Sequence, residues 1–272
     1  MINIIKTGGV ATVTLNRPDK HNAFNDEIIK MLTEAFLDID QDDTIKVMIL
    51  AARGKSFSAG GDLAWMRRMA SFSHQENVDD AHKLAVMLKT LNCMSKPTIA
   101  KIQGSAFGGA IGLISCCDIA VASSNAKFCL SEVKIGLTPA TISPYVIAAM
   151  GERAARRYFL TAEIFDAEIA QSTDLISEVC EPSELDSIVL RLCHALLANS
   201  PQAMKQAKQL IHHVANSPLD DVLIKETSVR IANIRASQEG KEGLTAFLEK
   251  RKPSWVTGKP AEGSSAPAEG SD

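Results

Sequence analysis

The chain has 272 residues, of which 46% are hydrophobic and 22% are charged, a composition typical of a globular protein. The formal net charge is −3, which argues against a general nucleic-acid binder because such proteins carry a basic face. No apolar run approaches the roughly 20 residues of a membrane span, and the N-terminus does not resemble a secretion signal, so we expect a cytoplasmic protein. The six cysteines form no CxxC pair and no zinc-finger spacing, which favours reduced thiols and no metal site.

The first two thirds of the chain alternate between strand-like and helix-like segments. Alternation over residues 10–15 predicts a strand, and short apolar runs predict strands buried on both faces at residues 46–51, 97–102 and 118–122. Helical spacing predicts helices over residues 25–39 and 78–94. The first of these carries an apolar face made of Ile28, Ile29, Leu32, Ala35, Phe36 and Ile39. Strands alternating with helices predict an α/β fold.

After about residue 186 the strand signal disappears. Helical patterns follow one another at residues 188–197, 201–214, 219–234 and 241–250. The final stretch has no large apolar residue and cannot offset the entropy of becoming ordered. We therefore expect an α/β core over residues 1–195, a helical C-terminal region over 196–257 and a disordered tail over 258–272.

Two predicted strands run into glycine-rich turns, at residues 49–62 and 99–110. Glycine lets a ligand approach the main chain closely, and a turn that opens a helix offers unpaired N–H groups. Two such turns can aim two N–H donors at one oxygen, which is the design of an oxyanion hole. The alternative is that these glycines serve only tight turns and packing. Neither turn has the spacing of a phosphate-binding loop.

Six stretches carry a more specific pattern. They are LNRPDKHNAF (15–24), SFSAGGDL (56–63), KPTIAKIQGSAFGGA (96–110), CDIA (117–120), GLTP (136–139) and AFLEKR (246–251). In this order they resemble the enoyl-CoA hydratase/isomerase (crotonase) family over about residues 3–255. The resemblance implies a crotonase-like spiral of ββα units with a C-terminal helical oligomerisation region, assembled as a homotrimer or as a hexamer of two trimers. It implies an acyl-CoA thioester substrate and no separate cofactor, because coenzyme A is part of the substrate.

The resemblance also implies roles for individual residues. The N–H groups of Gly61 and Gly109 hold the thioester oxygen, on which enolate charge builds during the reaction. The residues that contact coenzyme A are Lys20, His21, Ala59, Gly61, Asp62, Leu63, Phe247 and Lys250, with Phe247 and Lys250 often serving a neighbouring subunit. Without the resemblance, the two lysines are ordinary solvated surface charges.

Glu132 is the candidate acid–base residue. It lies between apolar neighbours, where partial burial raises a carboxyl pKa, although a surface or helix-capping carboxylate is the alternative. By resemblance it is the second glutamate of hydratases and the single glutamate of many isomerases. The position of the first hydratase glutamate is Gly112, so either Glu132 acts alone or another group helps to hold water. Hydroxyls near the matching loop are Thr141, Ser143 and Tyr145, each of which also fits an ordinary loop role.

The missing acid favours a Δ3-Δ2 enoyl-CoA isomerase, because one base can move a proton from C2 to C4. Residues 61–70 and 131–145 instead resemble the bacterial methylglutaconyl-CoA hydratase branch of leucine breakdown, or its relative for carboxygeranoyl-CoA. The second carboxylate of such a substrate needs a cation, for which Arg67, Arg68 and Lys101 are candidates unless they are surface charges. We therefore expect a lyase that hydrates 3-methylglutaconyl-CoA or a similar branched 2-enoyl-CoA, with the isomerase as the alternative.

Two other function classes fit the sequence less well. A eukaryotic relative of these hydratases binds RNA through a lysine-rich helix, but the matching helix here, residues 26–40, has only Lys30 against several acids. A serine peptidase on the related Clp-protease spiral needs a histidine and an aspartate beside its serine. The six histidines show no triad or metal-site pattern.

Overall fold

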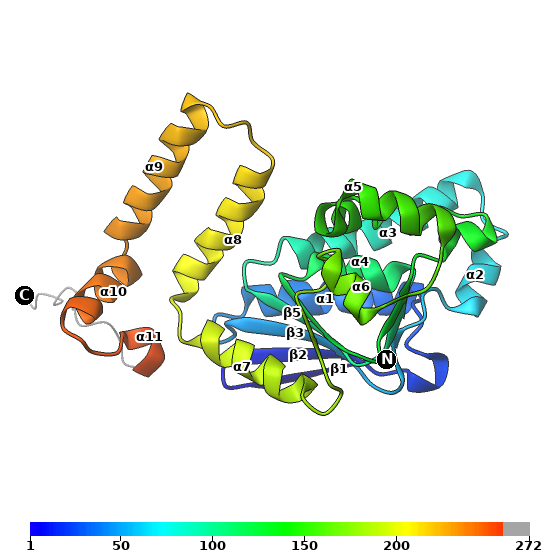
Figure 1. The fold of residues 1–272 in the computed structure, drawn as a ribbon, viewed down its shortest axis with the longest axis horizontal. Coiled ribbons are helices and arrows are strands. Elements are labelled where there is room, and N and C mark those ends of the chain that lie inside the picture. The colour runs from blue at the N-terminus through cyan, green and yellow to red at the C-terminus, as the bar shows by residue number, and fades with distance from the viewer. Residues whose placement is uncertain (258–272) are drawn as a thin grey trace, which may run out of the picture. The chain divides into compact units, whose positions relative to one another are not determined.

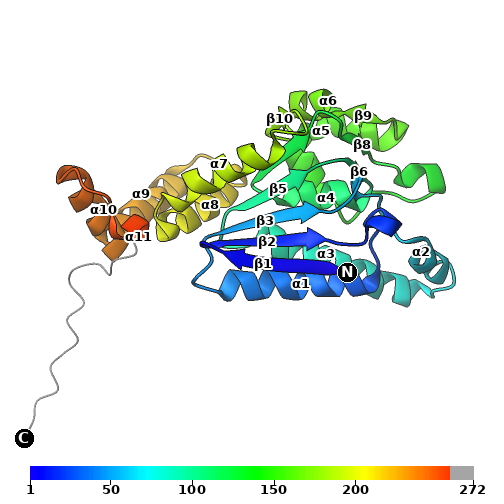
Figure 2. The same ribbon diagram turned by 90° about the horizontal axis from the view of Figure 1, so that it is seen from below.

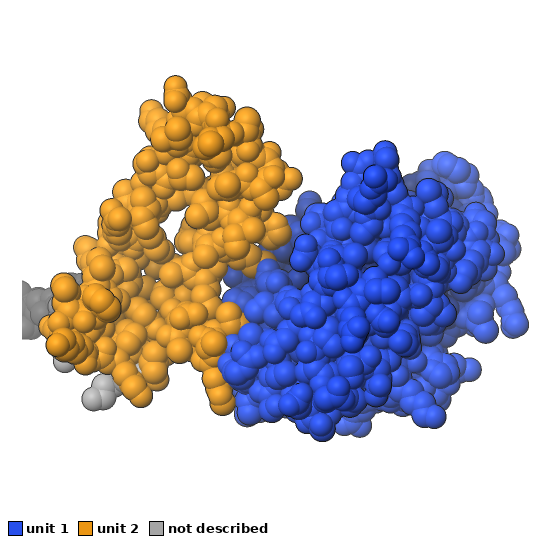
Figure 3. Space-filling view, in the orientation of Figure 1, with its two compact units in different colours: residues 1–193 blue, residues 194–272 orange. Residues whose placement is uncertain are grey.

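The computed structural model describes residues 1–257 and divides the chain into two compact units. The first is Met1–Cys193 and the second begins at His194, as coloured in Figure 3. This division and the predicted boundary after residue 195 both fall in α7 (Leu185–Leu197). The predicted disordered tail, residues 258–272, lies outside the described residues. None of the helices within residues 1–257 is both long and apolar enough to cross a membrane.

The first unit is built on a six-stranded sheet with the strand order β1–β2–β3–β5–β7–β10. β1 is antiparallel to β2, and the other neighbouring pairs are parallel. The strands are β1 (Ile2–Thr7), β2 (Val10–Leu15), β3 (Val47–Ala52), β5 (Thr98–Ile102), β7 (Ile119–Ser123) and β10 (Glu178–Cys180). The apolar runs of β3, β5 and β7 reflect burial on both faces, which is typical of parallel strands, so the four strands predicted from the sequence are confirmed.

A second sheet consists of very short strands in the order β4–β6–β8–β9. They are β4 (Ser56–Ser58), β6 (Ser105–Phe107), β8 (Lys127–Cys129) and β9 (Phe165–Asp166). β4, β6 and β8 each follow a strand of the large sheet, of which Figure 1 labels β1, β2, β3 and β5. Each of the three short strands is followed in turn by a helical segment. This repeat of two strands and a helix is the ββα spiral that the resemblance implied, so the predicted fold is confirmed.

The helical segments of the first unit follow the strands in chain order. They are η1 (Pro18–Lys20), α1 (Asp26–Gln41), α2 (Leu63–Met69), α3 (His74–Asn92), α4 (Gly109–Cys116), η2 (Glu132–Ile135), α5 (Ser143–Thr161) and α6 (Ala167–Ser172). α1 begins where the Asn25 side chain accepts the Ile28 N–H at 2.9 Å, and it runs along the large sheet (Figure 2). Its buried residues are the six that the helical spacing predicted.

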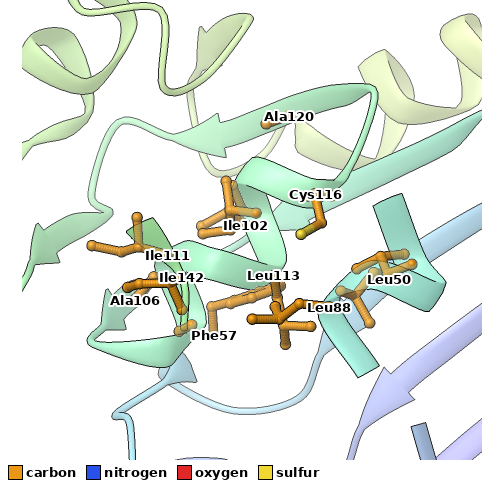
Figure 4. Close-up of a cluster of buried hydrophobic side chains, with 14 of the residues drawn as sticks. Leu50, Phe57, Leu88, Ile102, Ala106, Ile111, Leu113, Cys116, Ala120 and Ile142 are labelled. Atoms are coloured by element: carbon orange, nitrogen blue, oxygen red, sulfur yellow. The ribbon is translucent and has the colours of Figure 1, made fainter. Parts of the chain in front are cut away.

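The buried core supports both glycine-rich turns. Figure 4 shows side chains from both sheets, α3 and α4 packed together, among them Leu50, Phe57, Leu88 and Leu113, all with no exposed surface. Ile142, from the segment that enters α5, joins this cluster and is 1% exposed. Because α4 is buried along nearly its whole length, its N-terminus is held on a rigid base.

The second unit is helical, as predicted. Its helices are α8 (Pro201–Ala215), α9 (Asp221–Ala236), α10 (Gln238–Leu248) and α11 (Ser254–Thr257). Ser200 caps α8 by accepting the Ala203 N–H at 3.0 Å, and Pro201 occupies the first turn, where proline fits best. Many large apolar side chains of this unit are exposed, including Ile211 at 67% and Phe247 at 80%.

Candidate active site

The first glycine-rich turn follows β4 and is held by the main chain of Phe24. The Phe24 N–H donates to the Gly60 carbonyl, and the Asp62 N–H donates to the Phe24 carbonyl, both at 2.7 Å. Successive N–H groups of an extended chain point to opposite sides, so the Gly61 N–H points away from Phe24. No hydrogen bond within residues 1–257 uses this N–H. It is available to a ligand.

Asp62 fixes the end of the same turn. Its side chain accepts the Ala64 N–H at 2.8 Å and caps α2, and it pairs with Arg17 at 3.0 Å in a half-buried setting. Burial opposes ionisation of Asp62, but the Ala64 amide and the Arg17 guanidinium outweigh it and keep the pKa of this carboxyl below its ordinary value. The charged pair therefore holds the Gly61 turn in place.

The second turn places Gly108 before α4 and makes Gly109 the first residue of that helix. Gly108 has a φ of 56° and a ψ of −126°, a conformation that only glycine adopts readily. Its N–H donates to the Cys129 carbonyl at 2.9 Å, which ties the turn to β8. The Gly109 N–H makes no hydrogen bond in the described part of the chain. It lies in the first turn of α4, at the positive end of the helix dipole.

Phe24 connects the two turns. Its main chain holds the Gly61 turn, and its ring atoms Cε2 and Cδ2 lie 3.3 and 3.5 Å from where a Cβ at Gly109 would be. The ring is buried, with 2% of its residue surface exposed. Phe24 thus acts as a spacer between the two N–H donors. In the sequence, Phe24 stands out only as the last residue of a matching stretch, and no pattern indicated this role.

Glu132, the first residue of η2, faces the second turn. Its Oε1 lies 3.3 Å from where a Cβ at Gly108 would be. Its Oε2 is buried and has no hydrogen-bond partner within residues 1–257. Burial raises the pKa of the Glu132 carboxyl, and its own backbone amide offsets only part of this effect. A buried carboxylate oxygen without a partner beside a free helix N-terminus is suited to exchange protons with a ligand.

The position of the absent first glutamate is filled by an apolar side chain. A Cβ at Gly112 would lie 2.8 Å from the Cβ of Ile142, closer still to its Cγ2, and 3.4 Å from Cδ2 of Leu88. The hydroxyl of Ser143 is not turned to this position, because it donates to the Ala140 carbonyl at 2.8 Å. No pattern in the sequence indicated Ile142, because the contact joins residues 30 positions apart.

Replacing Gly112 with alanine is expected to destabilise the protein. In an ordinary helix this change stabilises by roughly 0.5–1 kcal/mol, but here the new methyl group overlaps Ile142, and overpacking of this kind costs about 1–3 kcal/mol. Urea unfolding of Gly112→Ala, Ile142→Ala and the double variant measures the coupling. We expect Gly112→Ala to be neutral or stabilising once Ile142 is alanine. An unchanged midpoint for the single variant would contradict the overlap.

The other predicted coenzyme A contacts lie in both units. In the first unit, the His21 carbonyl accepts the Ala59 N–H at 2.9 Å, which joins these two residues directly. Lys20 is exposed at the end of η1, and Leu63 is 72% exposed at the start of α2. In the second unit, Phe247 is exposed in the last turn of α10, and Lys250 is exposed just beyond that helix.

The three cations suggested for a substrate carboxylate differ in their surroundings. Arg68 pairs with Asp26 at 2.6 Å, and Lys101 pairs with Asp186, so both have acidic partners on the surface. Arg67 is exposed on α2, shortly after the Gly61 turn, and has no ion pair among the described residues. Of the three, Arg67 is the one available to an anion.

Comparisons with known proteins agree with this architecture. A family model described as enoyl-CoA hydratase/isomerase matches residues 6–258. A crystal structure of an enoyl-CoA hydratase from Shewanella pealeana is 47% identical, with a TM-score of 0.91, and the match covers 93% of this chain and 95% of that one. The short-chain-enoyl-CoA hydratase of Clostridium acetobutylicum is 32% identical, covering 91% and 94%. The trans-2-decenoyl-[acyl-carrier-protein] isomerase of Streptococcus mutans is 30% identical, covering 92% and 95%.

Proposed function

Because this chain belongs to the enoyl-CoA hydratase/isomerase family, we propose that it is a lyase that adds water to the double bond of a 2-enoyl-CoA thioester. The observation that carries the proposal is the buried, unpartnered Oε2 of Glu132 beside the second glycine turn. The name of the similar Clostridium acetobutylicum protein, a short-chain-enoyl-CoA hydratase, supports the same reaction.

In this proposal the two glycine turns bind the thioester carbonyl. The N–H groups of Gly61 and Gly109 donate to its oxygen, where negative charge develops as the enolate forms. Fixed N–H dipoles stabilise that charge without reorganising, so they favour the transition state over the bound substrate. The Phe24 spacer and the Arg17–Asp62 pair keep the two donors at their separation.

Glu132 performs both proton transfers. Its carboxylate takes a proton from water while the water oxygen bonds to C3, and the electron pair of the double bond moves onto the thioester oxygen. The Glu132 carboxylic acid then gives that proton to C2 as the enolate collapses. The sum is the addition of one water molecule to one face of the double bond. In the reverse direction the same groups remove water.

For the coenzyme A moiety we propose contacts from the residues that the family resemblance implied. We propose contacts from Lys20, His21, Ala59 and Leu63, of which His21 and Ala59 are joined by a main-chain hydrogen bond, and Asp62 contributes by holding the first turn through Arg17. Phe247 and Lys250 are proposed to contact the coenzyme A of a neighbouring subunit in a homotrimer or hexamer. Phe247 is 80% exposed, which suits a residue that serves another subunit.

For the acyl group we propose 3-methylglutaconyl-CoA or a similar branched substrate. The support is the resemblance of residues 61–70 and 131–145 to that branch of the family. Arg67, exposed and without an ion pair among the described residues, supplies a cation for the second carboxylate. Substitution of Arg67 is therefore expected to weaken activity on substrates that have this carboxylate more than activity on substrates that lack it.

The second candidate function is a Δ3-Δ2 enoyl-CoA isomerase. The observation that favours it is Ile142, which fills the place of a first glutamate and leaves Glu132 as the carboxylate of the site. The similarity to an isomerase of Streptococcus mutans is consistent with it. In this reaction Glu132 moves one proton from C2 to C4 and no water is added.

Product mass separates the two candidates. The protein is incubated separately with 3-methylglutaconyl-CoA, crotonyl-CoA and a 3-enoyl-CoA. The masses of the acyl-CoA products are measured by mass spectrometry. We expect a product heavier by one water from the 2-enoyl substrates. The 2-enoyl product of the 3-enoyl substrate has an unchanged mass and is recognised by the ultraviolet absorbance of its conjugated double bond. Its formation, with no gain of water from any substrate, would establish the isomerase instead.

A further inference from the structure

We propose that Ser131 is the second polar group of the water site, so that its hydroxyl and the Glu132 carboxylate together hold the water that adds to the double bond. The inference rests on the proposed hydration. It names the group that takes over the task of the acid missing at Gly112. Ser131 has no assigned role in the sequence patterns, where it only precedes Glu132.

The two side chains face one small space above Gly108. A Cβ at Gly108 would lie 3.3 Å from Oε1 of Glu132 and 3.9 Å from Oγ of Ser131. Because Gly108 has no side chain, no Cβ stands between these two oxygens. The space adjoins Gly109, whose N–H is one of the two proposed donors to the thioester oxygen. A water in this space therefore lies next to the bound thioester.

The Ser131 hydroxyl is free to bind water. Ser131 precedes η2, but its side chain makes no capping hydrogen bond, and no hydrogen bond of its hydroxyl is present within residues 1–257. Its main chain is engaged, because its carbonyl accepts the Lys134 N–H at 3.1 Å, so the residue is well anchored. An ordered water needs two to four polar partners, and Glu132 alone supplies too few.

The hydrogen bonds of this water follow from the chemistry. The water donates one hydrogen to Glu132, which later receives it, and the other to Oγ of Ser131. One of its two lone pairs is then directed at C3 of the substrate. Ser131 gains and loses no proton, so its contribution is to position the nucleophile. A carboxylate from position 112 cannot take this place, because Ile142 occupies the path.

Ser131→Ala tests the proposal through a split between two activities of the same site. We expect the kcat for hydration of crotonyl-CoA to fall by about 10–100-fold with KM nearly unchanged, since misplacement of a reacting group by an ångström has effects of this size. Exchange of the C2 proton of butyryl-CoA with D2O needs Glu132 and the oxyanion donors but no positioned nucleophile. We expect that exchange rate to stay within about threefold of wild type, far less than the change in kcat.

Two further variants serve as controls. Ser131→Thr keeps the hydroxyl and is expected to recover most of the hydration rate. Ser143→Ala removes a nearby hydroxyl that is bonded to the Ala140 carbonyl, and it is expected to hydrate like wild type. Hydration by Ser131→Ala at the wild-type rate would overturn the inference alone, as would an equal loss of hydration and proton exchange. A wild-type protein that exchanges the C2 proton but hydrates no enoyl-CoA would overturn the proposed function itself.

Discussion

Glu132→Gln is expected to lower the kcat for hydration by about 10²–10⁴-fold, the usual contribution of a positioned acid–base group. Glutamine keeps the size and the hydrogen-bonding ability of the side chain but cannot accept a proton. KM is expected to change little, because the coenzyme A contacts and the oxyanion donors remain. Stopped-flow or steady-state measurement of crotonyl-CoA hydration, with Glu168→Gln on the exposed side of α6 as the matched control, checks this result.

The pH dependence gives an independent check on the same residue. Glu132 has to be ionised to take a proton from water, and burial raises its pKa above the ordinary 4.5. Hydration is therefore expected to fall as the pH decreases through a value above 4.5. In the window between the two pKa values the folded protein holds a proton that the unfolded chain releases, so the free energy of unfolding falls as the pH rises.

In Glu132→Gln this group does not titrate, so its contribution to the decrease in the free energy of unfolding with rising pH is absent. The melting temperature of the variant is therefore expected to exceed that of wild type at neutral pH, by an amount that shrinks as the pH is lowered toward 4.5. Thermal unfolding of both proteins across this range measures the difference. A variant with full activity, or one less stable than wild type at neutral pH, would contradict the assignment of Glu132 as a buried, unpartnered base.

Gly109→Pro is expected to lower kcat/KM by about 10²–10³-fold relative to Gly109→Ala, the effect of removing one oxyanion donor. Proline has no N–H, and Gly109 is the first residue of α4, the helical position at which proline is best tolerated. Both substitutions add a Cβ at 3.3 Å from the Phe24 ring, so the alanine variant reproduces this contact and keeps the donor. The ratio of kcat/KM between the two variants therefore measures the contribution of the Gly109 N–H.

Folding has to be verified for this pair before the rates are compared. Equal far-UV circular dichroism and melting temperatures within a few degrees would show that α4 tolerates both side chains. Under those conditions, equal rates close to that of wild type for the proline and alanine variants would remove Gly109 from the oxyanion hole. Equal and large losses in both variants would instead assign the effect to displacement of Phe24.

The long elements of the fold were predicted well from the sequence because their apolar residues recur at a regular spacing over many positions. The six buried residues of α1 recur at helical spacing over 16 residues, and β3 is an unbroken apolar run. The small sheet was not predicted, because β4, β6 and β8 have three residues each and show no period. α3 begins at His74 rather than near residue 78, because Ser73 and Glu76 form a capping box ahead of the apolar positions.

For the candidate site, local motifs indicated the groups that lie close together in sequence. Gly61, Gly109 and Glu132 each belong to a recognisable stretch, and the structure shows Glu132 beside the turn that carries Gly109. The packing contacts of Phe24 and Ile142 could not be predicted from the sequence, because each joins residues that are far apart in the chain. In the sequence, an isoleucine just before a helix looks the same whether its side chain packs in the core or fills the space that a glutamate side chain would need.

The contact between Gly112 and Ile142 also constrains the routes by which this protein can evolve. A change of Gly112 to glutamate meets Ile142 before it can supply a second carboxylate. A change of Ile142 to alanine first leaves a buried hole, which costs about 2–5 kcal/mol. Each single step is thus opposed, and only the pair is compatible with a two-carboxylate site. Epistasis between positions 112 and 142 therefore keeps a lineage with this pair of residues at one active-site carboxylate, even where a second carboxylate would speed the reaction.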